Sequence, residues 1–188
     1  PDPERQLGRF PMHLSGGMRQ RISIAIALAA EPKLLIADEP TTSLDVTIQA
    51  QILELLRRQQ IERKMALILV THDLGVVANY ADDIVVMYAG QIVESCATGS
   101  LIRRPRMPYT KALMNSAPRL SDPPHTRLSA IPGMPPNSLS VLPGCRFNDR
   151  CPYVMDQCRE KTPPLSFDLD PNHRFACWSP LQIDDGAI

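Results

Sequence analysis

The chain lacks three features that would place it in familiar classes. Its 188 residues carry 20 basic and 20 acidic side chains, so it has no net positive charge of the kind that nucleic-acid binders usually show. Its longest apolar runs, 22–30 and 66–70, fall far short of the roughly 20 residues that cross a bilayer. No charged stretch followed by an apolar leader opens the sequence. We therefore expect no nucleic-acid partner, no membrane span and no secretion.

Cysteine is also scarce, and its placement is uneven. Four of the five cysteines, Cys145, Cys151, Cys158 and Cys177, lie in the last quarter of the chain. Without an export signal, such clustering favours a metal over disulfides. Five residues separate the first two and six separate the next two, which fits neither paired zinc ligands nor the common ferredoxin patterns. Spacing alone therefore does not name the metal, and Cys96 is expected to be an ordinary thiol.

The pattern of residues 33–94 predicts an α/β fold. Short β-branched runs at 34–37, 67–71 and 84–88 indicate buried strands of a parallel sheet. Between the first two runs, Ile48, Ile52, Leu55 and Leu56 recur at helical spacing, which predicts a helix packed on the sheet. Gly90 indicates a turn into a return strand, and hence an antiparallel hairpin at the sheet edge.

The C-terminal part of the sequence changes in composition. Short helices are expected at 100–104 and just after Pro108, where proline favours a first turn. Prolines then recur from 118 to 143, a spacing that excludes a long helix or a central strand. We therefore predict three parts: an α/β domain at 1–104, a short helix with a Pro-rich linker at 105–144, and a small, irregular Cys-containing tail at 145–188.

Two glycines stand at the start of a predicted helix. Gly16 and Gly17 follow Ser15, a good N-cap residue. Each glycine in a helix costs about 1 kcal/mol relative to alanine, so a compensating role is expected. Glycine permits close backbone approach, and a helix N-terminus presents free N–H groups to a phosphate. An ordinary capped helix remains the alternative.

Polar residues follow two of the predicted strands. Asp38 and Glu39 end the first strand before Pro40, at the edge where α/β sheets bind ligands. Because successive strand side chains face opposite ways, the two carboxylates should differ in role: Asp38 to hold Mg²⁺ and Glu39 to activate a water. His72 follows the second strand, in position to contact a γ-phosphate. The alternative is an acidic pair that merely begins a solvated loop.

Taken together, four stretches resemble a known set of motifs. "LSGGMRQR", "LLIADEP", "SLD" and "LVTHD", in this order, are similar to the signature, Walker B, D-loop and switch histidine of ABC-type ATPases. The longer sequence from Leu14 to Leu53 resembles that of the ATP-binding subunits of dipeptide and oligopeptide importers. So do "YAGQIVE", "RRPRMPYTKAL" and "GCRFNDRC".

The resemblance implies a P-loop NTPase-like sheet with flanking helices and an ATPase that energises peptide import. It implies ATP and Mg²⁺ as cofactors, with a second ATP-binding subunit, transmembrane permease subunits and, indirectly, a substrate-binding protein as partners, at the cytoplasmic face of the membrane. It also implies a [4Fe–4S] cluster in the tail, with Zn²⁺ as the alternative. The residues that it assigns are Glu39 and His72 for catalysis; Ser15, Gly16, Gly17, Gln20, Asp38 and Asp45 for the nucleotide, with Asp38 on Mg²⁺; and Cys145, Cys151, Cys158 and Cys177 for the cluster.

One family motif is missing. No Gly-x-x-x-x-Gly-Lys-[Ser/Thr] occurs, because none of the nine glycines precedes a lysine. We therefore expect this chain to be the C-terminal part of a nucleotide-binding domain and to be inactive alone. Two other functions remain: a soluble ABC ATPase acting on ribosomes or DNA, and a metal-binding module with an ATPase remnant. Retention of Asp38, Glu39 and His72 argues against a remnant.

Overall fold

The computed structural model describes residues 3–117, 123, 130–136, 143–167 and 169–182. Within these residues the chain forms two compact units, which divide between His72 and Asp73. The three sequence-predicted domains do not coincide with this division and stay a prediction. Much of the predicted Pro-rich linker lies outside the described residues.

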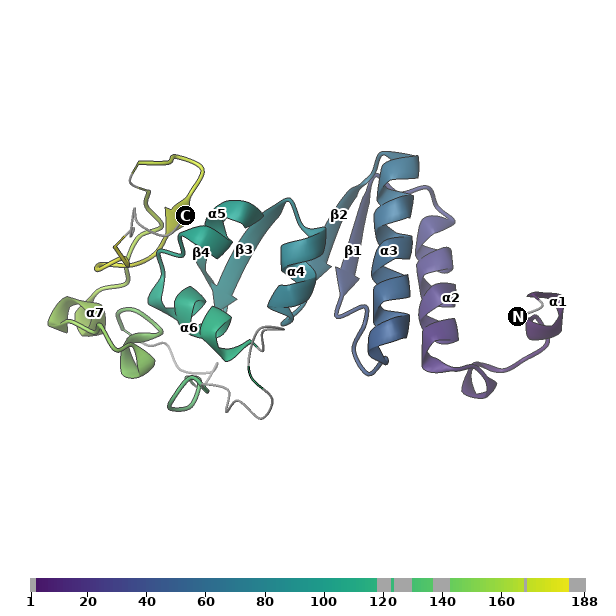
Figure 1. Cartoon of the computed structure of the whole chain (residues 1–188), viewed down its shortest axis with the longest axis horizontal. Coiled ribbons are helices and arrows are strands. Elements are labelled where there is room, and N and C mark those ends of the chain that lie inside the picture. Colours follow the sequence, from purple (N-terminus) through teal and green to yellow (C-terminus); the bar gives the residue numbers. More distant parts are fainter. Residues whose placement is uncertain (1–2, 118–122, 124–129, 137–142, 168, 183–188) are drawn as a thin grey trace. The chain divides into compact units, whose positions relative to one another are not determined.

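The first unit is built around a parallel β-α-β crossover (Figure 1). Its elements are α1 (Pro3–Gln6), η1 (Pro11–His13), α2 (Gly16–Leu28), β1 (Leu34–Asp38), α3 (Val46–Arg63) and β2 (Ala66–Val70). Strands β1 and β2 run parallel, with Leu34 opposite Ala66 and Asp38 opposite Val70. This register brings the carboxyl ends of both strands to the same edge, as predicted.

Polar caps define where the two long helices begin. The Ser15 hydroxyl accepts a hydrogen bond from the Met18 N–H at 3.3 Å, which confirms the predicted N-cap of α2. Asp45 Oδ1 accepts one from the Ile48 N–H at 2.9 Å and begins α3. These side chains satisfy amide groups that have no partner inside the helix.

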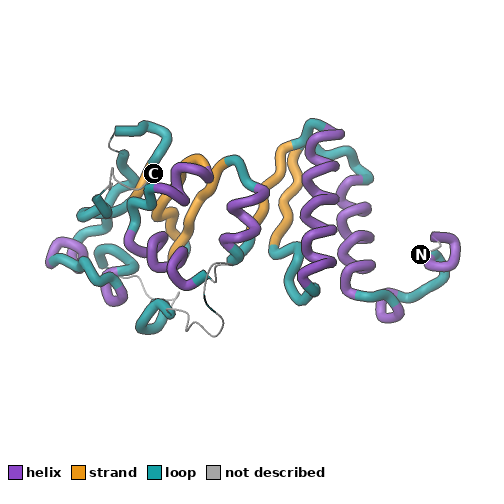
Figure 2. Tube along the Cα trace, in the orientation of Figure 1, coloured by secondary structure: helices purple, strands orange, loops and turns teal. Residues whose placement is uncertain are grey.

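The core of the first unit lies on both sides of α3, which lies between α2 and the two strands (Figure 2). Ile52 and Leu56 of α3 are almost fully buried against Leu35 of β1 and against Ile24 and Leu28 of α2. The helix predicted from apolar spacing is therefore present, and its apolar positions pack against α2 as well as against the sheet.

The strands are less buried than predicted. Alternate side chains of β1 and β2 face away from α3, and Ile36 and Ile68 are 62% and 47% exposed. Leu34 and Val70 share this exposed apolar face. The continuous apolar runs predicted burial on both faces, but in the described residues a helical layer covers one face of this sheet.

The second unit holds an antiparallel sheet of order β3-β4-β5. Its elements are α4 (Leu74–Tyr80), β3 (Asp83–Tyr88), β4 (Gln91–Ala97), α5 (Thr98–Arg103), α6 (Pro108–Ser116), η2 (Asn148–Arg150), α7 (Asp156–Glu160) and β5 (Arg174–Phe175). The hairpin turns through Ala89 and Gly90, both at positive φ, as a two-residue turn of a twisted hairpin requires. The prediction that β3 continues the parallel sheet is wrong, because β3 belongs to this second sheet, where it pairs antiparallel with β4.

The tail and the hairpin share one core. Phe147 is 1% exposed and its ring packs against those of Tyr88 and Tyr109. Strand β5 adds to β4 through Phe175 opposite Glu94. The predicted short helices are confirmed as α5 and α6, with Pro108 at the first turn of α6.

Candidate functional site

The carboxyl ends of β1 and β2 bring Glu39 and His72 together. The Glu39 N–H donates to the Val70 carbonyl at 2.9 Å, which continues the β1–β2 ladder one step beyond the strand. His72 Nδ1 lies 2.8 Å from Glu39 Oε1. Since an ionised carboxylate only accepts, the ring N–H is the donor. The sequence-predicted pair is therefore in direct contact.

A third residue, Thr42, completes this cluster. The Thr42 hydroxyl donates to Glu39 Oε2 at 2.5 Å, and the Thr42 N–H donates to the Glu39 carbonyl at 3.2 Å. The hydrogen bond from Thr42, followed by that from His72, lowers the pKa of the Glu39 carboxyl below its ordinary value. Sequence reasoning missed Thr42, although a turn beginning with Glu39-Pro40 places the fourth residue beside the first.

The cluster is open to solvent. The side chains of Glu39 and His72 are 39% and 81% exposed. Glu39 also has a φ of 47°, in the left-handed region that a non-glycine residue rarely adopts. The carboxylate is therefore accessible to water, and its role as a general base stays a prediction.

Asp38 lies at the last position of β1, opposite Val70 in the register, and is exposed. Its carboxylate oxygens are the type of ligand that Mg²⁺ prefers. Its role as a magnesium ligand stays a prediction.

The glycine pair at the start of α2 has a packing explanation. A Cβ on Gly17 would lie 2.7 Å from Ile48 Cγ2, and one on Gly16 would lie 3.1 Å from Leu44 Cδ2. The absent side chains allow α2 to approach the start of α3 closely. A contact of Ser15, Gly16 and Gly17 with phosphate stays a prediction, as does a nucleotide role for Gln20, whose side chain is half-buried.

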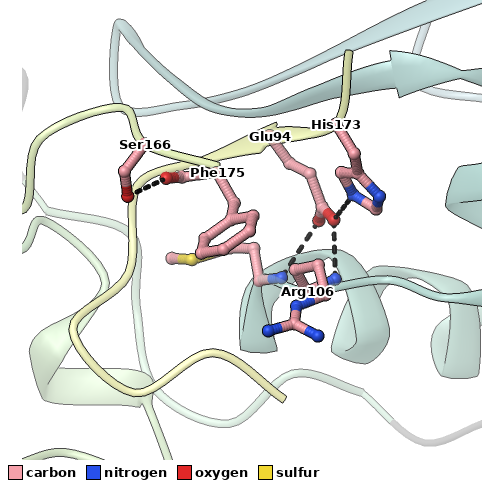
Figure 3. A network of polar contacts seen from close by, with 6 residues as sticks. Glu94, Arg106, Ser166, His173 and Phe175 are labelled. Atoms are coloured by element: carbon pink, nitrogen blue, oxygen red, sulfur yellow. Dashed lines mark hydrogen bonds and ion pairs between the residues drawn. The ribbon is translucent and has the colours of Figure 1, made fainter. Parts of the chain in front are cut away.

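Sequence reasoning also missed a buried polar network in the second unit (Figure 3). The Glu94 carboxylate has no exposed surface and accepts hydrogen bonds from the N–H groups of Arg106 at 2.6 Å and Met107 at 3.1 Å. Its third partner is His173 from the tail, whose Nε2 lies 2.7 Å from Glu94 Oε1. The Arg106 guanidinium lies over the Phe175 ring, 5.1 Å from its centroid.

The tail cysteines contact a shared core. All five cysteines are free thiols, and Cys145, Cys151 and Cys177 pack against the same apolar cluster. Burial raises the pKa of the Cys177 thiol to about 11 and also raises those of Cys145 and Cys151. Among the described residues, no group of three or more His, Cys, Asp or Glu side chains is arranged to hold a metal ion. The predicted cluster is therefore not supported by this arrangement.

Two family models match the chain. Residues 2–42 match the model for ABC transporters, and residues 93–158 match the model for the C-terminal region of oligopeptide/dipeptide transporters. The chain belongs to the ABC transporter ATP-binding family. The first match includes Ser15, Asp38, Glu39 and Thr42, whereas His72 lies beyond it.

Relatives of this ABC chain agree with both matches. It is 52% identical over 97% of its length to a probable peptide ABC transporter ATP-binding protein of Sinorhizobium fredii. It is 51% identical over 93% to the oligopeptide transport ATP-binding protein OppD of Mycobacterium tuberculosis, and 49% over 96% to the dipeptide transport ATP-binding protein DppD of Escherichia coli. The chain covers 54%, 28% and 55% of these proteins, respectively, so it spans about half the length of two of them and little more than a quarter of OppD. In the part that the structure describes, no helix has the length and apolar character of a membrane span.

Proposed function

We propose that this chain is part of the ATP-hydrolysing subunit of an ABC-type importer of dipeptides or oligopeptides. The observation that carries the proposal is the Glu39–His72 contact of 2.8 Å at the ends of two parallel strands, in a chain of the ABC family. Peptides are favoured over ribosomal or DNA substrates because residues 93–158 match the oligopeptide/dipeptide transporter region.

Glu39 acts as the general base in this proposal. The carboxylate is ionised at neutral pH, and the hydrogen bonds that lower its pKa stabilise this form, which can accept a proton from the attacking water. His72 orients the carboxylate and faces the solvent, where it can contact the γ-phosphate. Bound ATP with Mg²⁺ supplies the phosphate bond that is cleaved, and Asp38 is the proposed ligand of the metal.

In this proposal, the residues at the start of α2 bind the nucleotide that a partner subunit holds. Ser15, Gly16, Gly17 and Gln20 lie in the first turns of α2, whose N-terminus suits a phosphate. Asp45 caps α3 through its Oδ1 atom and would fix the end of the loop that joins Glu39 to α3. We propose that a second ATP-binding subunit provides the opposite half of each site.

The proposed assembly also includes transmembrane permease subunits and a separate substrate-binding protein. This assignment places the chain at the cytoplasmic face of the membrane as a peripheral subunit. It is supported by the names of the relatives, which are peptide, oligopeptide and dipeptide transport ATP-binding proteins.

The test compares this chain with a completed subunit, in which the missing N-terminal part is taken from the S. fredii relative. We expect the completed subunit to hydrolyse ATP and the 188-residue chain to show no turnover, since it lacks the phosphate-binding Gly-Lys motif. In the completed subunit, Glu39→Gln should lower kcat by about 10²- to 10⁴-fold while ATP binding persists, because a base is lost and a phosphate ligand is not.

Glu54→Gln is the matched control, because Glu54 is exposed on α3. It should leave kcat within about twofold of the parent. Steady-state hydrolysis that is unchanged by Glu39→Gln would contradict the assigned role. Turnover by the 188-residue chain that depends on Glu39 would contradict the need for the N-terminal part.

We separately propose that Cys145, Cys151, Cys158 and Cys177 bind one metal centre, a [4Fe–4S] cluster in preference to Zn²⁺. Thiolates suit both metals. The Cys145 N–H donates to the Cys158 carbonyl at 2.7 Å, and the other two cysteines pack on the same core. Binding has to draw these thiols into a common centre and deprotonate them, against the raised pKa values of Cys145, Cys151 and Cys177.

Anaerobic purification followed by iron, sulfide and zinc analysis tests this proposal. We expect iron and sulfide in the parent chain and in Cys96→Ser, the matched control outside the tail. Both should be lost in the Cys151→Ser/Cys158→Ser double variant. Stoichiometric zinc without sulfide would contradict the cluster, and metal retained in the double variant would contradict the ligand assignment.

A further inference from the structure

We propose that Thr42 is a positioning residue for Glu39, which fixes the direction of the carboxylate that activates water. The inference rests on the proposed ATPase function. Two hydrogen bonds join the same pair of residues: the Thr42 N–H donates to the Glu39 carbonyl at 3.2 Å and the Thr42 hydroxyl donates to Glu39 Oε2 at 2.5 Å. The main chain therefore sets where the hydroxyl lies, and the hydroxyl sets where the carboxylate points.

The local sequence explains why this turn forms. Pro40 has its φ fixed near the value that the second position of a β-turn requires. The backbone hydrogen bond from Thr42 closes the turn, and the bond from the Glu39 N–H to Val70 attaches it to the end of the sheet. Glu39 stays in the left-handed region because hydrogen bonds fix both its N–H group and its carbonyl group.

The two carboxylate oxygens have different partners. His72 Nδ1 contacts Oε1, whereas the Thr42 hydroxyl contacts Oε2. A carboxylate offers about four lone-pair positions, so each oxygen keeps one for a water molecule. Without the Thr42 hydroxyl, one contact to the ring would remain, and the carboxylate could rotate about it.

The experiment compares Thr42→Val, Thr42→Ser and Thr47→Val with the parent in the completed subunit. Thr47 is exposed in the first turn of α3 and provides the same chemical change away from Glu39. We expect Thr47→Val to leave kcat unchanged.

The measurement is the steady-state rate of ATP hydrolysis against ATP concentration. Thr42→Val should lower kcat roughly three- to tenfold, with the KM for ATP within about twofold of the parent. Thr42→Ser should restore the rate, because serine keeps the hydroxyl.

The two proposals fail in different ways. If Glu39→Gln keeps full activity, the proposed function is wrong, whatever Thr42→Val does to the rate. If Glu39→Gln is inactive but Thr42→Val keeps the parent kcat, the positioning role alone is wrong. A lower kcat that Thr42→Ser does not restore would also overturn it.

Discussion

A carboxylate without solvent exposure, that of Glu94, is stabilised by three contacts. Two are backbone N–H groups at the start of α6, and the third is His173 from the tail. A buried acidic group is costly unless such partners satisfy it. Residues 79 positions apart in sequence thus meet at one side chain. Neither spacing nor periodicity along the chain indicates that Glu94 and His173 are partners, so their contact could not be predicted from the sequence.

Replacing Glu94 with glutamine should destabilise the second unit. The amide keeps the shape but turns a donor NH₂ towards one of the N–H groups of Arg106 and Met107 or towards the ring of His173. We expect a loss of about 1–3 kcal/mol in the free energy of unfolding, measured by urea denaturation. Glu160→Gln is the control, because Glu160 is exposed on α7. Equal midpoints for the two variants would show that the network contributes no stability.

At the level of elements, α2 and α3 pack closely because Gly17 has no side chain. A methyl group there would lie 2.7 Å from the branched Ile48 side chain, which rotates little within a helix. Gly16 would meet only the flexible end of Leu44 at 3.1 Å. The sequence predicted a special role for both glycines from their helix cost, and the structure adds that this role includes helix packing.

Alanine substitutions should separate the two glycines. Both changes favour the helix by about 1 kcal/mol, but Gly17→Ala also overpacks the contact with Ile48, a cost of about 1–3 kcal/mol. We therefore expect Gly16→Ala to unfold at or above the parent urea midpoint, and Gly17→Ala at or below it. A Gly17→Ala midpoint above that of Gly16→Ala would contradict the close contact.

Local features of the fold and site were largely predictable from the sequence. Ser15 and Asp45 precede helices, and the apolar spacing of Ile52 and Leu56 indicated the face of α3 that packs inward. Glu39 and His72 were predicted at the ends of two parallel strands, and the structure adds the direct contact between them. Thr42 was missed because its role depends on a side-chain rotamer in a turn, which apolar periodicity does not report.

Across the whole chain, strand partners were less predictable. The apolar run of β3 has the same character as those of β1 and β2, yet it belongs to another sheet. Burial also depends on what covers a strand, and a run of β-branched residues does not say whether both faces are covered. The tail was predicted to be irregular. Its contribution of Phe147 and β5 to the hairpin core was therefore not expected.

The exposed face of the two-stranded sheet has a practical consequence for handling the isolated chain. Leu34, Ile36, Ile68 and Val70 form an apolar surface, and in the described residues β1 and β2 each have a single strand neighbour. Open strand edges beside apolar side chains are templates for association between copies. Light scattering that rises with protein concentration is therefore to be expected during purification, and low concentrations with a solubilising fusion partner suit work with the isolated chain.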